Sequence, residues 1–341
     1  MTNFDDVISF ANLYKAHRRA RLGKRHKKEV ILFEANLSQN LWKLHYDLKY
    51  NKYEMSGYHH FTIYEPKQRE IQAICYTDRI VQHSLCDNFL IPLFERRLIY
   101  DNCACRRGKG TSFAVKRLKK FMAKHYKLHG LSGYFVKVDV RKYFDSINHN
   151  VLKQKLNGVI MDERVKNLAF YFIDSYNGDS GKGLPMGNQS SQCFGLYYLD
   201  ELDRFFKEKM KVKFYLRYMD DILMIVPSKA MAKNCLKHAE ILLNKNLLEI
   251  NPKSQIMHIK NGVEFLGWRF SLTIKGNIKQ KIKRATAKRV VGKLKHIHFL
   301  CVHNRKQIEY IKRAIVSYKG LLSIGGCSVT PCIEKSVKFA L

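Results

Sequence analysis

The chain has 341 residues, of which 46% are hydrophobic and 12% aromatic, enough to bury a sizeable core. That composition excludes a disordered chain, and a total of six prolines excludes a proline-rich linker protein. Lys and Arg number 62 against 29 Asp and Glu, so the formal net charge is +33, which favours nucleic acid as a partner, with an anionic membrane as the alternative.

The apolar runs are too short to span a bilayer, and the first residues contain no basic segment followed by an apolar stretch. We therefore expect a cytoplasmic protein that does not bind membrane. Nine cysteines form no CxxC pair, and only Cys103 and Cys105 lie close together. Reduced cysteines that pack as small apolar residues are expected, rather than a zinc site.

The N-terminal part begins with a basic run at residues 15–28, and apolar spacing then predicts a helix over residues 29–50. Residues 61–71 have a strand-like pattern with a short polar turn. A second helical pattern, over residues 78–98, keeps its apolar residues on one face.

An aspartate follows the predicted strand over residues 134–140. Alternation places Tyr134 and Val136 on one side of this strand and Lys137 and Asp139 on the other. A carboxylate at the end of a mostly buried strand costs several kcal/mol unless it is compensated. A divalent metal would compensate it, and so would an arginine partner or a role as a helix N-cap.

A second acidic feature lies within residues 213–227, where two apolar strand-like runs flank the sequence Tyr218-Met219-Asp220-Asp221. This pattern predicts a tight hairpin with two acids at its tip. Aspartate is common in turns for conformational reasons alone, but hard oxygen ligands from two strands are what Mg²⁺ requires when it also bridges a phosphate. Two such ions would activate a primer 3′-hydroxyl and stabilise a leaving pyrophosphate.

The C-terminal side is basic over a long stretch, with no acidic residue and twelve Lys and Arg between positions 265 and 308. Val290, Leu294, Ile297 and Cys301 recur there at helical spacing, which predicts a helix with one face on a core and the other facing phosphates. A merely solvated basic face is the alternative.

Taken together, these blocks resemble a reverse transcriptase. YMDD (218–221) is similar to that family's catalytic box, and FVKVDVRKYF (135–144) to its first catalytic strand. Four further segments resemble family blocks in the family's order: the fingers (63–85), the substrate-contacting loop and helix (183–192), the segment with a proton donor (247–255) and the primer-grip hairpin (263–270).

The resemblance implies an α+β right-hand fold with fingers, a ferredoxin-like palm built on an antiparallel sheet, and a helical thumb. The implied parts are a basic N-terminal extension (1–60), part of the fingers (61–133), the palm with an insertion (134–262), and the primer grip with a basic helical thumb (263–341). The implied activity is RNA-directed DNA polymerisation by two-metal nucleotidyl transfer, with two Mg²⁺ ions, or Mn²⁺ in their place.

Site residues are implied by position in the matching blocks. The residues implied to bind the metal ions are Asp139, Asp220 and Asp221. Lys253 is implied to protonate the pyrophosphate. The residues implied to contact the nucleotide are Lys67, Arg69, Phe144 (a steric gate against a ribose 2′-hydroxyl), Met186, Gly187 and Gln192. Those implied to contact nucleic acid are Arg107, Lys109, Lys281, Lys283, Arg284 and Lys288, with Phe265, Leu266 and Gly267 as the primer grip.

The run Leu184-Pro185-Met186-Gly187 departs from most of the family, which has Gln where Met186 stands. An apolar residue there resembles the reverse transcriptases of diversity-generating retroelements, which implies error-prone copying. The implied partners are an RNA template (a structured noncoding RNA), a DNA or RNA primer, the cDNA product and dNTPs, together with a small basic accessory protein or a second reverse transcriptase. A defence-associated (anti-phage) reverse transcriptase and a non-catalytic RNA-binding protein on the same fold are the alternatives.

Overall fold

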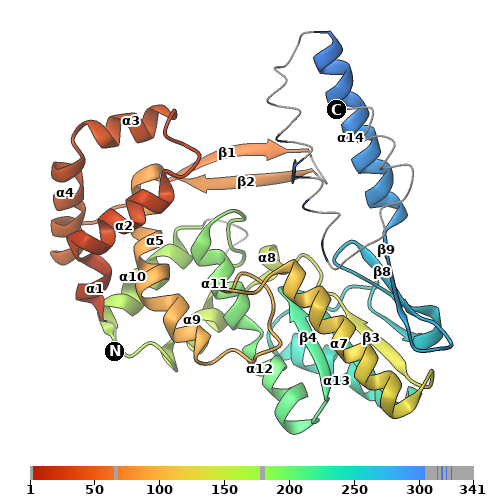
Figure 1. The fold of residues 1–341 in the computed structure, drawn as a ribbon. Helices are drawn as coiled ribbons and strands as arrows, with labels where there is room; N and C mark the ends of the chain where they lie inside the picture. Colours follow the sequence, from red (N-terminus) through yellow and green to blue (C-terminus); the bar gives the residue numbers. More distant parts are fainter. Residues whose placement is uncertain are drawn as a thin grey trace. The chain divides into compact units, whose positions relative to one another are not determined.

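The computed structural model describes residues 3–64, 68–176 and 181–303, and the single residues 313, 316, 317, 320 and 324 (Figure 1). The chain divides into two compact units. Unit 1 comprises Met1–Tyr100, Val140–Phe205 and Ala239–Asn251, and unit 2 comprises Asp101–Asp139, Phe206–His238 and Pro252–Leu341.

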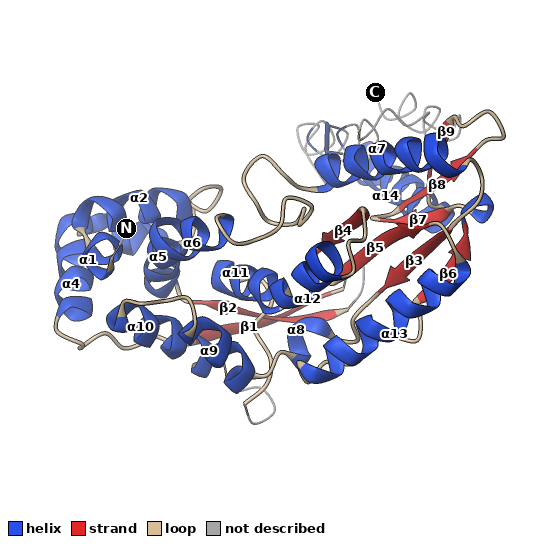
Figure 2. Ribbon diagram, turned by 90° about the horizontal axis from the view of Figure 1, so that it is seen from below, coloured by secondary structure: helices blue, strands red, loops and turns tan. Residues whose placement is uncertain are grey.

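Unit 2 is built on a four-stranded antiparallel sheet (Figure 2). Its strands, in the order β4-β5-β3-β6, are β4 Phe214–Tyr218, β5 Asp221–Val226, β3 Tyr134–Val138 and β6 Gln255–His258. The strands β4 and β5 form the predicted hairpin, with Tyr218 paired to Asp221. These strands consist mainly of β-branched, aromatic and other apolar residues, which favour a sheet buried on both faces.

One face of this sheet packs against helix α7 (Thr111–His129) and a second, three-stranded sheet made of β7 (Val263–Phe265), β8 (Trp268–Leu272) and β9 (Ile278–Ile282). Leu118 and Phe121 from α7 share this core with Phe135 and Leu223 from the larger sheet and Trp268 from β8. Burial of each such side chain contributes about 1.5–3 kcal/mol. The core therefore fixes the strands that carry the acidic residues.

Helix α14 (Arg284–Val302) follows the smaller sheet, as the apolar spacing predicts. Val290, Leu294 and Ile297 are buried. The side chain of Cys301 lies outside the described residues. The rest of the basic stretch is not all helical, because Lys281 lies in strand β9.

Unit 1 holds the N-terminal helices and a two-stranded hairpin, β1 (Tyr58–Ile63) with β2 (Arg69–Ile74). The helix expected over residues 29–50 is wrong as a single element, because the chain turns at Asn36 (φ −125°, ψ 46°) between two helices. Ile31 and Leu32, which extended the apolar spacing, are exposed. The helices that precede the hairpin are α1 (Phe4–Ile8), α2 (Phe10–Ala20), α3 (Lys28–Ala35) and α4 (Leu37–Lys49).

The expected helix over residues 78–98 is present as three consecutive segments, with a π-helical turn in the middle. These segments are α5 (Tyr76–Leu85), η1 (Cys86–Leu90) and α6 (Ile91–Glu95). Further helices in the described ranges up to residue 303 are α8 (Tyr143–Ser146), α9 (His149–Asn157), α10 (Glu163–Asp174), α11 (Gln189–Tyr198), α12 (Asp200–Arg204), η2 (Phe205–Lys209), α13 (Lys229–Lys245) and η3 (Ile259–Asn261).

Across the described ranges, no helix combines the length and apolar character that crossing a bilayer requires. The described cysteines carry free thiols, and Cys86, Cys103, Cys193 and Cys235 are buried, as expected for small apolar core residues.

Candidate active site

Three aspartates meet at one end of the larger sheet of unit 2. Asp139 directly follows β3, Asp220 lies in the β4–β5 turn, and Asp221 begins β5. β3 and β5 are neighbouring antiparallel strands in which Val138 pairs with Ile222. The next position along each strand therefore brings Asp139 opposite Asp221, although the two are 82 positions apart in the chain.

The electrostatics of this corner are unfavourable for negative charge. Burial raises the pKa of Asp221, Lys137 opposes the shift, and the carboxylates of Asp139 and Asp220 add to it, so that the resulting pKa is about 6. Lys137 Nζ lies 3.4 Å from Asp221 Oδ1 and also donates to the carbonyl oxygen of Glu264 at 3.1 Å. One lysine therefore only partly offsets the mutual repulsion of three acids.

The carboxylate of Asp221 also has an unused acceptor. Its Oδ1 atom is buried and, among the described residues, accepts no hydrogen bond, while Lys137 faces it as an ion pair at 3.4 Å. A buried, unsatisfied carboxylate oxygen is costly, and a cation would satisfy it. Oxygen ligands are those that Mg²⁺ prefers, so a divalent ion would satisfy this carboxylate oxygen.

The protein does not supply a complete metal site by itself. Within the described part of the chain, no three His, Cys, Asp or Glu side chains are grouped closely enough to hold a metal ion. Mg²⁺ in phosphate-transfer sites keeps waters and takes oxygens from the substrate, so an incomplete set of protein ligands is the expected arrangement for such an ion.

A serine holds the backbone of the first aspartate in place. The Asp139 N–H donates to Ser254 Oγ at 3.0 Å, and Ser254 Oγ donates back to the Asp139 carbonyl at 3.3 Å. Lys253 is the preceding residue and is exposed. The structure therefore brings the segment that contains Lys253 beside Asp139, at the end of β3, within unit 2.

The nucleotide-contact candidates of unit 1 form a second group. Arg69 in β2 lies with its Nη1 atom 3.8 Å from Met186 Sδ. Gly187 has φ +103°, a conformation that favours glycine, and a Cβ atom there would lie 3.6 Å from Ile71 in β2. Lys67 lies outside the described residues.

Phe144, the steric-gate candidate, is half-buried in unit 1. It packs beside Gly195 on α11, where a Cβ atom would come within 3.2 Å of the Phe144 ring. Tyr143 reinforces the same contact, because its hydroxyl donates to the Gly195 carbonyl at 2.5 Å. The glycine therefore leaves room for the ring that the steric-gate role requires.

A cavity of about 760 Å³ opens in unit 1 beside these residues, lined by Gly187, Gln192, Arg79 and the lysines Lys24 and Lys27 among others. Polar bonds hold the start of α11 against α5 and η1 at its wall. Gln82 Nε2 donates to Ser190 Oγ at 2.6 Å, and Gln189 Nε2 donates to Asp87 Oδ1 at 2.8 Å. The cavity is therefore lined by basic side chains, and hydrogen bonds fix the helix start that forms part of its wall.

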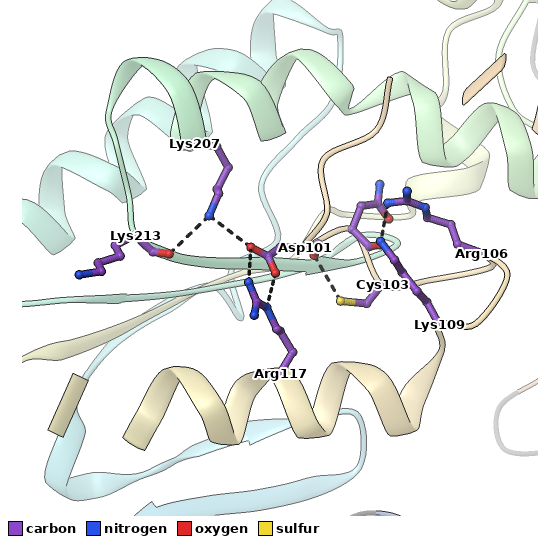
Figure 3. A network of polar contacts seen from close by, with 8 residues as sticks. Asp101, Cys103, Arg106, Lys109, Arg117, Lys207 and Lys213 are labelled. Carbon is purple, nitrogen blue, oxygen red and sulfur yellow. Dashed lines mark hydrogen bonds and ion pairs between the residues drawn. The ribbon is translucent and has the colours of Figure 1, made fainter. Parts of the chain in front are cut away.

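The loop with Arg107 and Lys109 lies in unit 2, beside a buried polar network (Figure 3). Lys109 Nζ and Arg106 Nη1 both donate to the Asn102 carbonyl, at 3.5 and 3.1 Å. Arg107 is exposed. The loop is therefore tied down by the neighbours of Arg107, which leaves this guanidinium on the surface.

The primer-grip candidates form the turn between β7 and β8. Phe265 is buried, and Leu266 (φ +49°) and Gly267 (φ +84°) both have positive φ, as a two-residue type I′ turn requires. Lys283 donates its N–H to the Gly267 carbonyl at 3.0 Å, and its Nζ atom lies 2.6 Å from Glu264 Oε2. Three further cations, Lys281, Arg284 and Lys288, are exposed.

Residues 55–270 match the sequence profile of the family described as reverse transcriptase (RNA-dependent DNA polymerase), which covers more than half of the chain. This chain belongs to the reverse transcriptase family. The mixed helices and antiparallel sheets confirm the expected α+β right-hand polymerase fold.

Individual relatives are distant. The COX1/OXI3 intron 2 protein of Saccharomyces cerevisiae is 24% identical over 260 residues, and Protein YkfC of Escherichia coli strain K12 is 23% identical over 251 residues. The match to the yeast protein covers 58% of this chain and 30% of that protein. The match to Protein YkfC covers 61% of this chain and 65% of that protein. The structure of telomerase from Candida albicans in complex with a fragment of telomeric RNA is similar in fold, with a TM-score of 0.51 at 14% identity over 88% of this chain and 63% of that one.

Several residues that support the candidate site were not predicted from the sequence. Ser254, Gly195 and Gln82 act through contacts with residues 51 to 115 positions away, so no local pattern marks them. Ser254 lies inside the block that resembles the proton-donor segment, and this is the one signal that pointed to its neighbourhood.

Proposed function

We propose that this reverse transcriptase extends DNA on an RNA template, with Asp139, Asp220 and Asp221 as its catalytic acids. The observation that carries the proposal is the buried Asp221 oxygen that accepts no hydrogen bond among the described residues, at a corner where two more carboxylates raise the pKa of Asp221. An arrangement that disfavours its own charge is typical of a site completed by a cation.

Divalent ions at these acids, Mg²⁺ or Mn²⁺, would favour ionisation of the primer 3′-hydroxyl and stabilise the charge of the leaving pyrophosphate. The residues of the chain have the remaining roles. Asp139 and Asp220 act as the principal ligands and Asp221 as a weaker one. Lys253 provides a proton for pyrophosphate, and its exposed position beside Ser254 is compatible with that role.

Around the nucleotide, we propose that Arg69 and Lys67 bind the triphosphate, because charge-assisted hydrogen bonds to phosphate are short and strong. Phe144 rejects ribonucleotides, since an aromatic wall leaves a 2′-hydroxyl neither space nor a partner. Gly187 and Gln192, at the wall of the cavity, contact the nascent base pair.

Nucleic acid is proposed to bind along basic and turn residues of unit 2. The residues proposed to contact the template or primer are Arg107, Lys109, Lys281, Lys283, Arg284 and Lys288, with Phe265, Leu266 and Gly267 as the primer grip. The corresponding parts are an N-terminal extension (1–60), fingers (61–133), palm (134–262) and thumb with primer grip (263–341).

The primary biological role that we propose is error-prone copying in a diversity-generating retroelement, with a structured noncoding RNA and a small basic accessory protein as partners. Met186 supports this, because a thioether cannot donate a hydrogen bond, whereas the Gln usual in the family can. Restoration of the amide in Met186→Gln should lower misincorporation opposite template adenine several-fold, measured by sequencing products from a defined template. An unchanged error spectrum contradicts the role of Met186.

A defence-associated reverse transcriptase, acting alone or with a second reverse transcriptase, is the alternative role for the same site. A non-catalytic RNA-binding protein is disfavoured, because a buried acid cluster without a function only destabilises the fold. Sequencing of cDNA bound to the purified protein separates the two catalytic roles, since diversification predicts adenine-directed errors in the product.

The decisive experiment for polymerisation is primer extension on RNA with Mg²⁺ and dNTPs. Asp220→Ala should abolish extension. Glu240→Ala, which removes an exposed acid from α13, serves as the matched control and should retain full activity. Extension by Asp220→Ala at the wild-type rate would refute the assigned metal site.

A further inference from the structure

Arg217 is a fully buried cation two residues before the turn that carries Asp220. It lies on β4, where it pairs with Ile222, and its relative exposure is 0%. Removing a guanidinium from water is costly unless its donors are used. We therefore ask which groups near Asp220 the buried guanidinium of Arg217 contacts.

One of those donors reaches the turn itself. Arg217 Nη1 donates to the carbonyl oxygen of Met219 at 2.8 Å. Met219 has φ +57°, which is uncommon for a residue with a side chain, so the turn conformation requires support from its surroundings. The arginine provides such support from the buried side of the turn.

The bond to Met219 also fixes the direction of the next residue. The Met219 carbonyl and the Asp220 N–H belong to one planar peptide group, which includes the Cα atom of Asp220. A peptide whose oxygen is held cannot rotate freely about its flanking bonds. The bond therefore holds in place the peptide plane and the Cα atom from which the Asp220 side chain extends.

The backbone of Arg217 is held in turn by the segment Asp101–Cys103, which runs along the outer edge of β4. The Arg217 N–H donates to the Asp101 carbonyl at 3.0 Å, and the Cys103 N–H donates to the Arg217 carbonyl at 2.8 Å. The Asp101 carboxylate is anchored by Lys207 at 3.2 Å and by Arg117 on both oxygens (Figure 3). Arg217 is thus attached to a rigid support.

We propose that Arg217 is a positioning residue that orients Asp220 for metal binding through the Met219 carbonyl. The inference rests on the proposed function, because it assigns a cation to Asp220. Loss of the Arg217 bond to Met219 should leave the three aspartates in the sequence and the fold but allow the Asp220 carboxylate to adopt other orientations. Loss of a residue that orients a metal ligand typically costs about 10- to 100-fold in metal affinity or activity.

The test measures Mn²⁺ binding by electron paramagnetic resonance, without polymerisation, in wild type, Arg217→Met and Arg217→Lys. Arg217→Met should bind Mn²⁺ about tenfold more weakly, and Arg217→Lys, which keeps the charge and one donor, should recover part of this loss. Asp220→Ala defines the signal of the site. Arg269→Met is the matched control, because Arg269 Nη2 also donates to a backbone carbonyl of unit 2, that of Asn261, at 2.9 Å.

Steady-state primer extension provides the second measurement. Arg217→Met should lower kcat about 10- to 100-fold, raise the Mg²⁺ concentration for half-maximal rate, and change KM for dNTP by less than about threefold. A purely structural role for Arg217 would lower the melting temperature and leave the Mg²⁺ requirement unchanged.

The outcomes separate the positioning role from polymerase function. If Arg217→Met folds and its Mn²⁺ affinity is within twofold of that of wild type, the proposal is overturned. If Arg217→Met does not fold, an Mn²⁺ affinity of Arg217→Lys within twofold of wild type overturns it. An Asp220→Ala protein that keeps wild-type Mn²⁺ affinity also overturns it. A wild type that binds Mn²⁺ in this Arg217-dependent way yet extends no primer refutes the proposed function and supports the positioning role.

Discussion

Two aspartates of unit 2, Asp101 and Asp221, have opposite surroundings. The side chain of Asp101 is 3% exposed and is neutralised by Arg117 on both oxygens and by Lys207 at 3.2 Å. The side chain of Asp221 is 23% exposed, yet it has one lysine at 3.4 Å and two further acids nearby. The more buried acid is the better satisfied one, so burial alone does not mark a functional carboxylate.

The contrast distinguishes an acid that stabilises the folded protein from an acid whose charge destabilises it. An acid whose partners are all supplied by the protein contributes to stability and has little capacity left for a ligand. An acid that lacks such partners costs stability and gains it back when a cation binds. Substitutions at the two places should therefore have opposite effects on stability and activity.

The largest expected effect is on catalysis at the acidic corner. Asp139→Asn keeps the shape of the side chain but removes its charge, and should lower the rate of primer extension about a thousandfold. Its free energy of unfolding in urea should equal or exceed that of wild type. Asp174→Asn, at an exposed ion pair with Lys153, is the isosteric control and should leave both values unchanged. A strongly destabilised Asp139→Asn protein would remove the distinction between the two regions.

The next effect is on stability at Asp101. Asp101→Asn leaves Arg117 and Lys207 without their carboxylate and should lower the free energy of unfolding by about 2–3 kcal/mol, since both cations are partly exposed and can be hydrated. Urea denaturation measures the loss. Asp174→Asn should cost less than about 0.5 kcal/mol in the same assay. An Asp101→Asn protein as stable as wild type would show that the network contributes little.

The opposite sign is expected at Asp221. Its unfolded carboxyl ionises near pH 4, whereas burial and its acidic neighbours raise the pKa in the folded protein to about 6. The unfolded state thus binds fewer protons between these values, so this residue lowers stability as pH rises from about 4 to 6, and the loss is complete above that range.

Asp221→Asn should therefore be more stable than wild type at pH 7 by on the order of 1–3 kcal/mol, without divalent ions, and equal to it near pH 4. Urea denaturation at both pH values measures the difference. A pH-independent difference would mean that Asp221 is not the source of the unfavourable charge.

The smallest effect is that of the metal on the melting temperature. Mg²⁺ at about ten times its dissociation constant should stabilise wild type by about 1.4 kcal/mol, and a chelator should reverse this. Mg²⁺ should not raise the melting temperature of Asp220→Ala. It should raise that of Asp101→Asn by as much as that of wild type, measured from the lower melting temperature of the metal-free variant. Equal stabilisation of all three proteins would place the bound ion elsewhere.

The parts of the fold and site that follow from sequence are those encoded locally. The β4–β5 hairpin follows from the two apolar runs that flank its turn, and the strand before Asp139 follows from alternation. The break at Asn36 is invisible to periodicity, since the apolar spacing continues through it. Contacts such as Ser254 with Asp139 join residues 115 positions apart and depend on tertiary packing.

The order of strands in the larger sheet has a consequence for biosynthesis. Strand β3, which Asp139 directly follows, lies between β5 and β6. Both of these strands are translated later, and β6 ends at His258. A nascent chain can therefore complete this sheet only after His258 has left the ribosome, because pairings between distant segments form late. Until then, β3 lacks its partner β6, and the Asp139 backbone lacks the support of the segment that contains Ser254.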